Sequence, residues 1–238
     1  MAAKQLSKLS TRARPFTRSI FYAKLRSSNH TMNDTCKHTL ELSDSAHSLT
    51  AVSGEVILLS GDSGCGKTGW LKRLAGLTDL PAGADVRIDG TDPNKHHIRM
   101  LFDRWPCIWL GQSVAEEICF GLKKRPAQQE LKQALLSWGL AELTTETGLE
   151  TLTRLQALRL SLTAMTLAKP ALLLLDNPTA SLSKTDARSV VDDVACWAKD
   201  SDSIIVVACN RWQDWQPAAS QEWCLSAPDA LPQLKLTQ

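Results

Sequence analysis

The sequence of 238 residues contains no apolar run close to the roughly 20 residues that a transmembrane helix needs. Any contact with a membrane is therefore expected to pass through a partner protein. The sequence has no segment that resembles a secretory signal peptide, and it has no C-x-x-C pair. The cysteines are therefore expected to be reduced thiols of a cytosolic protein, and neither disulfides nor a zinc site is predicted from them. The seven cysteines stand at positions 36, 65, 107, 119, 196, 209 and 224.

Acidic residues are missing from residues 1–31, which hold seven of the 27 basic side chains. This segment, expected to be a disordered leader, resembles an organelle transit peptide or a basic arm that binds phosphates. A third interpretation is that translation begins at Met32, and we favour it because a strand-like stretch, Thr39–Leu42, starts soon afterwards. With 43% hydrophobic and 22% charged residues, the remainder (32–238) is long enough for one globular domain with a sizeable core.

One segment matches the phosphate-loop pattern G-x-x-x-x-G-K-[ST] in full, and it reads Gly61-Asp62-Ser63-Gly64-Cys65-Gly66-Lys67-Thr68. It follows the apolar run 55–60 and precedes residues 70–77, whose apolar positions have helical spacing. A strand, a glycine loop and a helix are the order that a phosphate cradle needs, because the loop and the helix start point N–H groups at a polyphosphate. Lys67 is expected to contact the β and γ oxygens, and Thr68 to ligate Mg²⁺.

The same residues also spell Gly64-x-Gly66-x-x-Gly69, the fingerprint of dinucleotide sites. A dinucleotide site makes no use of a Lys-Thr pair, whereas a phosphate loop needs both residues. The phosphate-loop interpretation is therefore favoured.

A second anchor is the run Ala171-Leu172-Leu173-Leu174-Leu175-Asp176. Four leucines that end in an aspartate predict a parallel strand buried on both faces, with its carboxylate at the carboxyl edge of the sheet. Alone, Asp176 is better explained as a strand-end cap, but together with the phosphate loop it is expected to hold Mg²⁺. Helices expected at 127–138, 150–168 and 184–199 alternate with strands, which predicts an α/β fold with a mostly parallel sheet.

These segments resemble the nucleotide-binding domain of ATP-binding cassette (ABC) transporters over about 39–210. Residues 172–183 are similar to an apolar run followed by D-E-P-T-S-A-L-D, and 113–122 resemble T-V-x-E-E-I-x-F-G-L of cassettes in energy-coupling-factor importers. The resemblance implies a P-loop NTPase fold with an antiparallel β subdomain and a helical lobe at about 113–168. It also implies ATP and Mg²⁺ as cofactors, bound by Gly61 to Thr68 and by Asp176. Two cassettes would close over two ATP molecules.

Several positions depart from the family pattern. The catalytic glutamate is replaced by Asn177, and the switch histidine by Cys209, or by Asn210 if the register slips by one. The signature L-S-G-G-Q aligns with 152–156, where the first glycine has become Arg154. Asp103 falls at the Q-loop glutamine, with Gln112 as an alternative too close to the helix. Binding groups are thus retained while hydrolysis groups are replaced.

The resemblance therefore implies a cytosolic ATP-binding subunit of an ABC transporter that turns ATP over slowly. Its expected partners are a membrane permease, which 103–122 would face from the inner side of the membrane, and a second cassette, identical or different. No nucleic-acid partner is expected. Two alternatives remain open: a nucleotide-dependent regulatory module without a permease, and a small-molecule kinase. A kinase would need a lid of arginines, for which helix 127–138 offers only Lys132.

Overall fold

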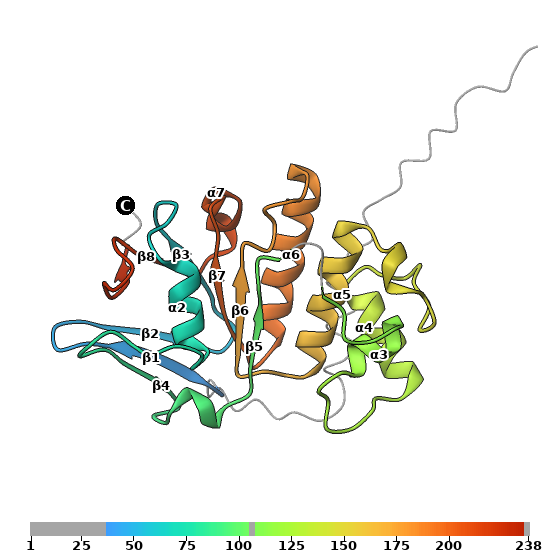
Figure 1. Cartoon of the computed structure of the whole chain (residues 1–238), viewed down its shortest axis with the longest axis horizontal. Coiled ribbons are helices and arrows are strands. Elements are labelled where there is room, and N and C mark those ends of the chain that lie inside the picture. Colours follow the sequence, from blue (N-terminus) through green and yellow to red (C-terminus); the bar gives the residue numbers. More distant parts are fainter. Residues whose placement is uncertain (1–36, 105–107, 236–238) are drawn as a thin grey trace, which may run out of the picture. The chain divides into compact units, whose positions relative to one another are not determined.

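The computed structural model describes residues 37–104 and 108–235. The leader 1–31 lies outside these ranges. The described chain contains two sheets, and the smaller one is antiparallel with the order β2-β1-β4 (Figure 1). Its strands alternate buried and exposed side chains, so one face belongs to the core. The strand bounds are β1 Thr39–Ser43, β2 Ser48–Val52 and β4 Asp85–Ile88.

The larger sheet has six strands in the order β5-β6-β7-β3-β8-β9. All neighbouring pairs are parallel except β8 with β9, and every residue of β3, β6 and β7 is buried, as expected of strands covered on both faces. These findings confirm the predicted α/β fold with a mostly parallel sheet and an antiparallel subdomain. The bounds are β3 Val56–Ser60, β5 Ile98–Leu101, β6 Leu172–Asp176, β7 Ile204–Ala208, β8 Gln221–Cys224 and β9 Gln233–Leu234.

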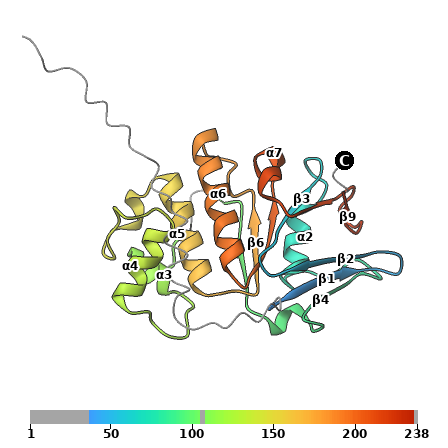
Figure 2. The same cartoon turned by 180° about the vertical axis from the view of Figure 1, so that it is seen from behind.

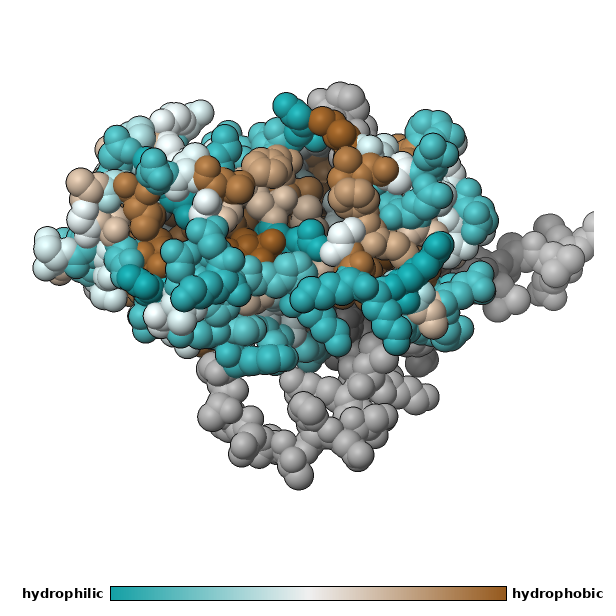
Figure 3. Space-filling model, turned by 60° about the horizontal axis from the view of Figure 1, so that its bottom comes forward, coloured by the Kyte–Doolittle hydropathy of each residue, from teal (hydrophilic) through white to brown (hydrophobic). Residues whose placement is uncertain are grey.

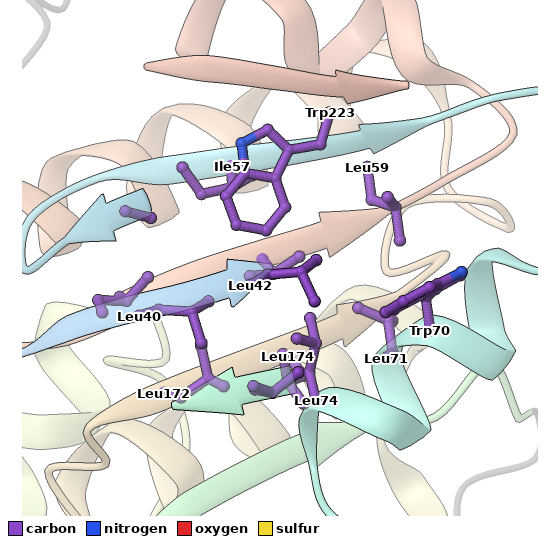
Figure 4. Close-up of a cluster of buried hydrophobic side chains, with 14 of the residues drawn as sticks. Leu40, Leu42, Ile57, Leu59, Trp70, Leu71, Leu74, Leu172, Leu174 and Trp223 are labelled. Carbon is purple, nitrogen blue, oxygen red and sulfur yellow. The ribbon is translucent and has the colours of Figure 1, made fainter. Parts of the chain in front are cut away.

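Two apolar layers cover the larger sheet. On one face, α2 (Lys67–Leu74) and the antiparallel strands pack against alternate residues of β3, β6 and β7. Figure 4 shows Leu40 and Leu42 of β1 and Leu71 and Leu74 of α2 gathered beside Leu172 and Leu174 of β6, with Trp223 above them. On the other face, α6 (Lys184–Asp200) packs on the opposite alternate residues of these strands. Figure 2 shows α6 running along this face of the sheet.

A separate apolar cluster joins α3 (Val114–Cys119), α4 (Gln128–Ser137) and α5 (Arg154–Leu167). Helix α5 begins four residues later than the 150–168 helix that the sequence predicted. The difference arises because Leu149–Thr151 form a short 3₁₀ helix, η2, and Thr153 then caps α5 in a reciprocal pair with Gln156.

The remaining short elements are η1 (Pro93–Lys95), α7 (Trp212–Trp215) and η3 (Gln216–Ala218). Among the described residues, no helix combines the length and the apolar character that crossing a membrane requires.

Candidate functional site

The loop between β3 and α2 is built on three glycines with left-handed backbones. Gly61, Gly64 and Gly66 have φ angles of 145°, 85° and 98°, which side chains disfavour. A Cβ at Gly61 would overlap the carbonyl oxygen of Leu225, and one at Gly66 would lie 2.7 Å from the Cα of Pro228. The segment after β8 therefore packs directly against the loop. Sequence reasoning missed this contact, because neither Leu225 nor Pro228 belongs to a recognisable motif.

The ammonium group of Lys67 is held inside this loop. Its Nζ donates to the carbonyl oxygens of Gly61 and Asp62, both at 2.8 Å, and the side chain is buried. Within the described residues, the N–H groups of Gly64, Gly66 and Lys67 have no hydrogen-bond acceptor. The loop thus presents a positive charge and unpaired donors at the start of α2, and these groups fit an anion such as a phosphate.

Thr68 and Asp176 meet beside the loop, at the carboxyl end of β6. The hydroxyl Oγ1 of Thr68 lies 3.1 Å from Oδ1 and 2.9 Å from Oδ2 of Asp176, so it can donate to the carboxylate. Asp176 is buried, and burial raises the pKa of its carboxyl group, as does the nearby charge of Asp103, while the Thr68 hydrogen bond acts in the opposite direction. A hydroxyl and a carboxylate are hard oxygen donors and fit Mg²⁺.

Asn177 links the ends of three strands. It lies directly after β6 with a left-handed φ of 45°, and its backbone N–H donates to the Ala208 carbonyl at 2.7 Å. Its side-chain Nδ2 donates to Oδ2 of Asp103 at 3.1 Å, and its Oδ1 accepts from the backbone N–H of Asn210 at 2.9 Å. The amide therefore uses both its donor and its acceptor, and a carboxylate in its place would face the carboxylate of Asp103.

Cys209 follows β7 and is buried. Burial raises the pKa of its thiol to about 12, and the charge of Asp214 acts in the same direction. The thiol therefore stays protonated at neutral pH and offers no basic lone pair comparable to that of an imidazole. Asn210, the alternative at this position, contacts Asn177 through its backbone N–H.

The segment aligned with the family signature occupies the start of α5. Thr153 accepts from the backbone N–H of Gln156 at 3.3 Å, and Oε1 of Gln156 accepts from the N–H of Thr153 at 2.9 Å. Arg154, the first residue of α5, is exposed. Thr153 and Gln156 therefore cap the helix, a role that the T-x-x-Q spacing could have indicated from the sequence.

An apolar groove of about 350 Å³ lies between the end of α2, β5, α3 and α5. Several large apolar side chains on its walls are exposed to solvent: Leu77 (59%), Phe102 (48%), Leu110 (61%) and Phe120 (56%). Figure 3 shows apolar side chains interrupting the mostly hydrophilic surface on the face that lies at the bottom of Figure 1. Exposed apolar surface of this kind marks sites where proteins bind partners.

A family model described as ABC transporter matches residues 45–180, which is more than half of the chain. The chain belongs to the ABC transporter family. The matched range contains the phosphate loop, the residues that line the groove, and Asp176 with Asn177. It ends before β7, so Cys209 lies outside it.

Two curated members of the ABC transporter family illustrate the similarity. The sulfate/thiosulfate import ATP-binding protein CysA of Methylococcus capsulatus is 32% identical over 164 residues, covering 63% of this chain and 45% of that protein. The spermidine/putrescine import ATP-binding protein PotA of Pseudomonas aeruginosa is 34% identical over 145 residues, covering 57% and 39%. The chain thus matches less than half the length of these relatives.

A solved structure supports the same fold. CbiO1 from Clostridium perfringens, part of the ABC transporter complex CbiONQ, aligns with a TM-score of 0.69 and 17% identity, covering 83% of this chain and 86% of that one. A putative metal-chelate type ABC transporter aligns with a TM-score of 0.67 and 18% identity. At this identity the likeness concerns the fold, which is the P-loop fold of ABC nucleotide-binding domains.

Proposed function

We propose that this chain binds Mg²⁺·ATP and serves as the ATP-binding subunit of an ABC transporter. The observation that carries the proposal is the contact of Thr68 with Asp176 beside a loop whose N–H groups and Lys67 ammonium surround a place for phosphates. Residues 61–68 would hold the triphosphate, and Thr68 and Asp176 would hold Mg²⁺. Bound Mg²⁺ would neutralise phosphate charge. In this proposal 32–238 form the nucleotide-binding domain, with 113–168 as its helical lobe.

Hydrolysis is proposed to be weak because no base occupies the two positions that supply one in the family. The Asn177 amide cannot accept a proton from water, and its two polar ends are engaged by Asp103 and Asn210. Cys209 is buried as a neutral thiol. The loss of a positioned general base typically lowers a rate by ~10²- to 10⁴-fold. ATP would then affect this chain chiefly through binding. Alternatively, ATP would be hydrolysed at a site that a second cassette completes.

The partner is proposed to be a membrane permease, which would place the subunit peripherally on the inner membrane face. Support comes from the names of the relatives, which are import ATP-binding proteins, and from the apolar groove whose walls include the exposed side chains of Phe102, Leu110 and Phe120. The groove borders β5, whose end leads to Asp103 and hence to Asn177. A partner that moves in the groove would therefore shift β5, and β5 is connected to the proposed nucleotide site through Asp103 and its hydrogen bond with Asn177.

The proposal is tested by measuring equilibrium ATP binding and steady-state ATPase activity on the same purified chain. The expected result is Mg²⁺-dependent ATP binding with a turnover at least ~100-fold below that of a cassette with an intact base. Absence of ATP binding would contradict the proposed function, while rapid hydrolysis would contradict only the part that concerns Asn177 and Cys209.

A further inference from the structure

Two histidines and an aspartate from three separate segments meet at the edge of the antiparallel sheet. His38 precedes β1, Asp89 is in the turn after β4, and His96 follows η1. One ligand atom from each residue lies within 4.8 Å of the other two. The side chains are half-buried, with exposures of 22%, 34% and 16%. This cluster takes no part in the proposed nucleotide site.

The backbone fixes Asp89 so that one carboxylate oxygen remains for the histidines. Its N–H donates to the carbonyl oxygen of Thr39 at 2.9 Å, and its Oδ1 accepts from the Thr39 N–H at 2.8 Å. The second oxygen, Oδ2, lies 2.7 Å from Nδ1 of His38 and 3.8 Å from Nδ1 of His96. Pairing of β1 with β4 therefore brings the ligand atoms together independently of any ion.

The hydrogen bonds of His96 favour the tautomer that a metal ligand requires. Its Nε2 lies 2.7 Å from Oγ1 of Thr91, and that hydroxyl is 3.2 Å from the carbonyl oxygen of Ile88, to which it can donate. The hydroxyl then accepts the Nε2–H of His96, and Nδ1 carries a lone pair facing Oδ2 of Asp89. A cation between Nδ1 of His96 and Oδ2 of Asp89, either a proton or a metal ion, removes the repulsion between these two lone pairs. Fixing a tautomer through the other ring nitrogen is how proteins orient histidine ligands.

We propose that His38, Asp89 and His96 form a binding site for a zinc-class divalent cation. Two imidazoles and one carboxylate suit Zn²⁺ and its neighbours Co²⁺ and Ni²⁺, whereas Mg²⁺ and Ca²⁺ prefer oxygen ligands. Tetrahedral ligands at ~2.1 Å from zinc are roughly 3.4 Å apart, so the present separations need side-chain shifts of less than about 1 Å. On binding, the Nδ1 proton of His38 passes to solvent and Nε2 takes up a proton from solvent, so that the neutral imidazole ligates the metal through Nδ1.

The proposed cation would join the start of β1 to the segment between η1 and β5. Strand β5 connects this segment to the loop that carries Asp103. A cation bound at the site would therefore restrain the strand that leads to Asp103. The site has three protein ligands, which leaves a fourth position for water or another group. Its cation is independent of the proposed function, because the Mg²⁺ site at Thr68 and Asp176 uses oxygen ligands alone.

The test compares zinc retained after dialysis by the chelator-treated full chain and by three variants. Asp89→Asn suits the left-handed φ of 52° and keeps the acceptor for Thr39, and His96→Gln removes the second imidazole. His47→Gln is the matched control, because His47 also lies beside an aspartate, with Nδ1 3.6 Å from Oδ1 of Asp44, but belongs to no ligand cluster among the described residues. Wild type and His47→Gln are expected to retain one zinc equivalent more than the other two.

Zinc is also expected to raise the Tm of wild type and His47→Gln and to leave the Tm of Asp89→Asn and His96→Gln unchanged. Excess Mg²⁺ should not displace the additional equivalent. Equal zinc content in all four proteins would overturn the proposal, because thiols elsewhere would then account for the metal. Displacement by Mg²⁺ would overturn the assignment to a zinc-class cation.

Discussion

At the scale of single residues, the proposed nucleotide site contains a carboxylate and an amide that we propose to stand in exchanged positions relative to the family pattern. The family pattern has glutamine in the Q loop and glutamate after the Mg²⁺ aspartate, whereas this chain has Asp103 and Asn177. The two side chains hydrogen-bond at 3.1 Å. In this chain the acid follows the end of β5 and the amide follows the end of β6.

The exchange predicts how activity responds to substitution. Asn177→Glu alone should raise ATPase turnover only slightly, because the new carboxylate faces that of Asp103. Combining Asn177→Glu with Asp103→Gln should raise turnover by ~10-fold or more over wild type, since a base is then present with an amide beside it. Steady-state ATPase assays measure both variants, with Asp103→Gln alone as the control. A single Asn177→Glu variant as active as the double variant would contradict the argument.

The buried carboxylate of Asp176 is predicted to lower the free energy of unfolding when no metal is bound. Burial raises its folded pKa above 3.8, so the folded state binds the proton more tightly than the unfolded state does. Below pH 3.8 the group is protonated in both states, and its destabilising effect develops as pH rises through the raised pKa. Asp176→Asn should therefore increase Tm at pH 7 without nucleotide, with a smaller gain near pH 4. Thermal unfolding across this pH range measures the difference, and a lower Tm for Asp176→Asn at pH 7 would show that the charge is stabilising.

At the scale of elements, a buried ion pair joins α5 to α6. Nη2 of Arg159 lies 2.8 Å from Oδ2 of Asp193 and 2.8 Å from Oγ of Ser189, and both charged side chains are largely buried. Removing one partner of such a pair leaves a charge poorly solvated, so Arg159→Met should lower the free energy of unfolding by ~3 kcal/mol. Lys37→Met is the control, because its pair with Asp202 is exposed and should contribute less than ~1 kcal/mol. Urea unfolding that gave the same loss for both variants would contradict this account.

Some elements were predictable from the sequence because their burial is complete. The runs 172–175 and 204–208 are apolar throughout, and both lie in central parallel strands. The spacing also indicated that Thr68 and Asp176 would stand at the same sheet edge, as they do. Strands β8 and β9 were not predicted, because Gln221–Cys224 is only partly apolar and Gln233–Leu234 has two residues. The Asn177 hydrogen bonds and the His38 cluster join segments far apart in sequence, and no local pattern encodes such contacts.

At the scale of the whole molecule, the groove and the nucleotide site are proposed to perform separable tasks. Leu110→Asp places a charge on the groove wall and should prevent co-purification with a permease while leaving ATP affinity within about twofold of wild type. Leu136→Asp is the matched control, because this leucine is also exposed, at 44%, but does not line the groove. Loss of the permease from both variants, or from neither, would contradict the assignment of the groove.

The central claim is that the glycine loop binds the triphosphate of ATP with the Lys67 ammonium. The most direct measurement is an equilibrium titration of wild type, Lys67→Ala and Lys132→Ala with ATP in the presence of Mg²⁺. Replacing the ammonium removes two or more charged hydrogen bonds and should weaken binding by at least ~100-fold. Lys132→Ala should bind like wild type, because Lys132 is an exposed residue of α4. Equal ATP affinity in Lys67→Ala and wild type would contradict the claim.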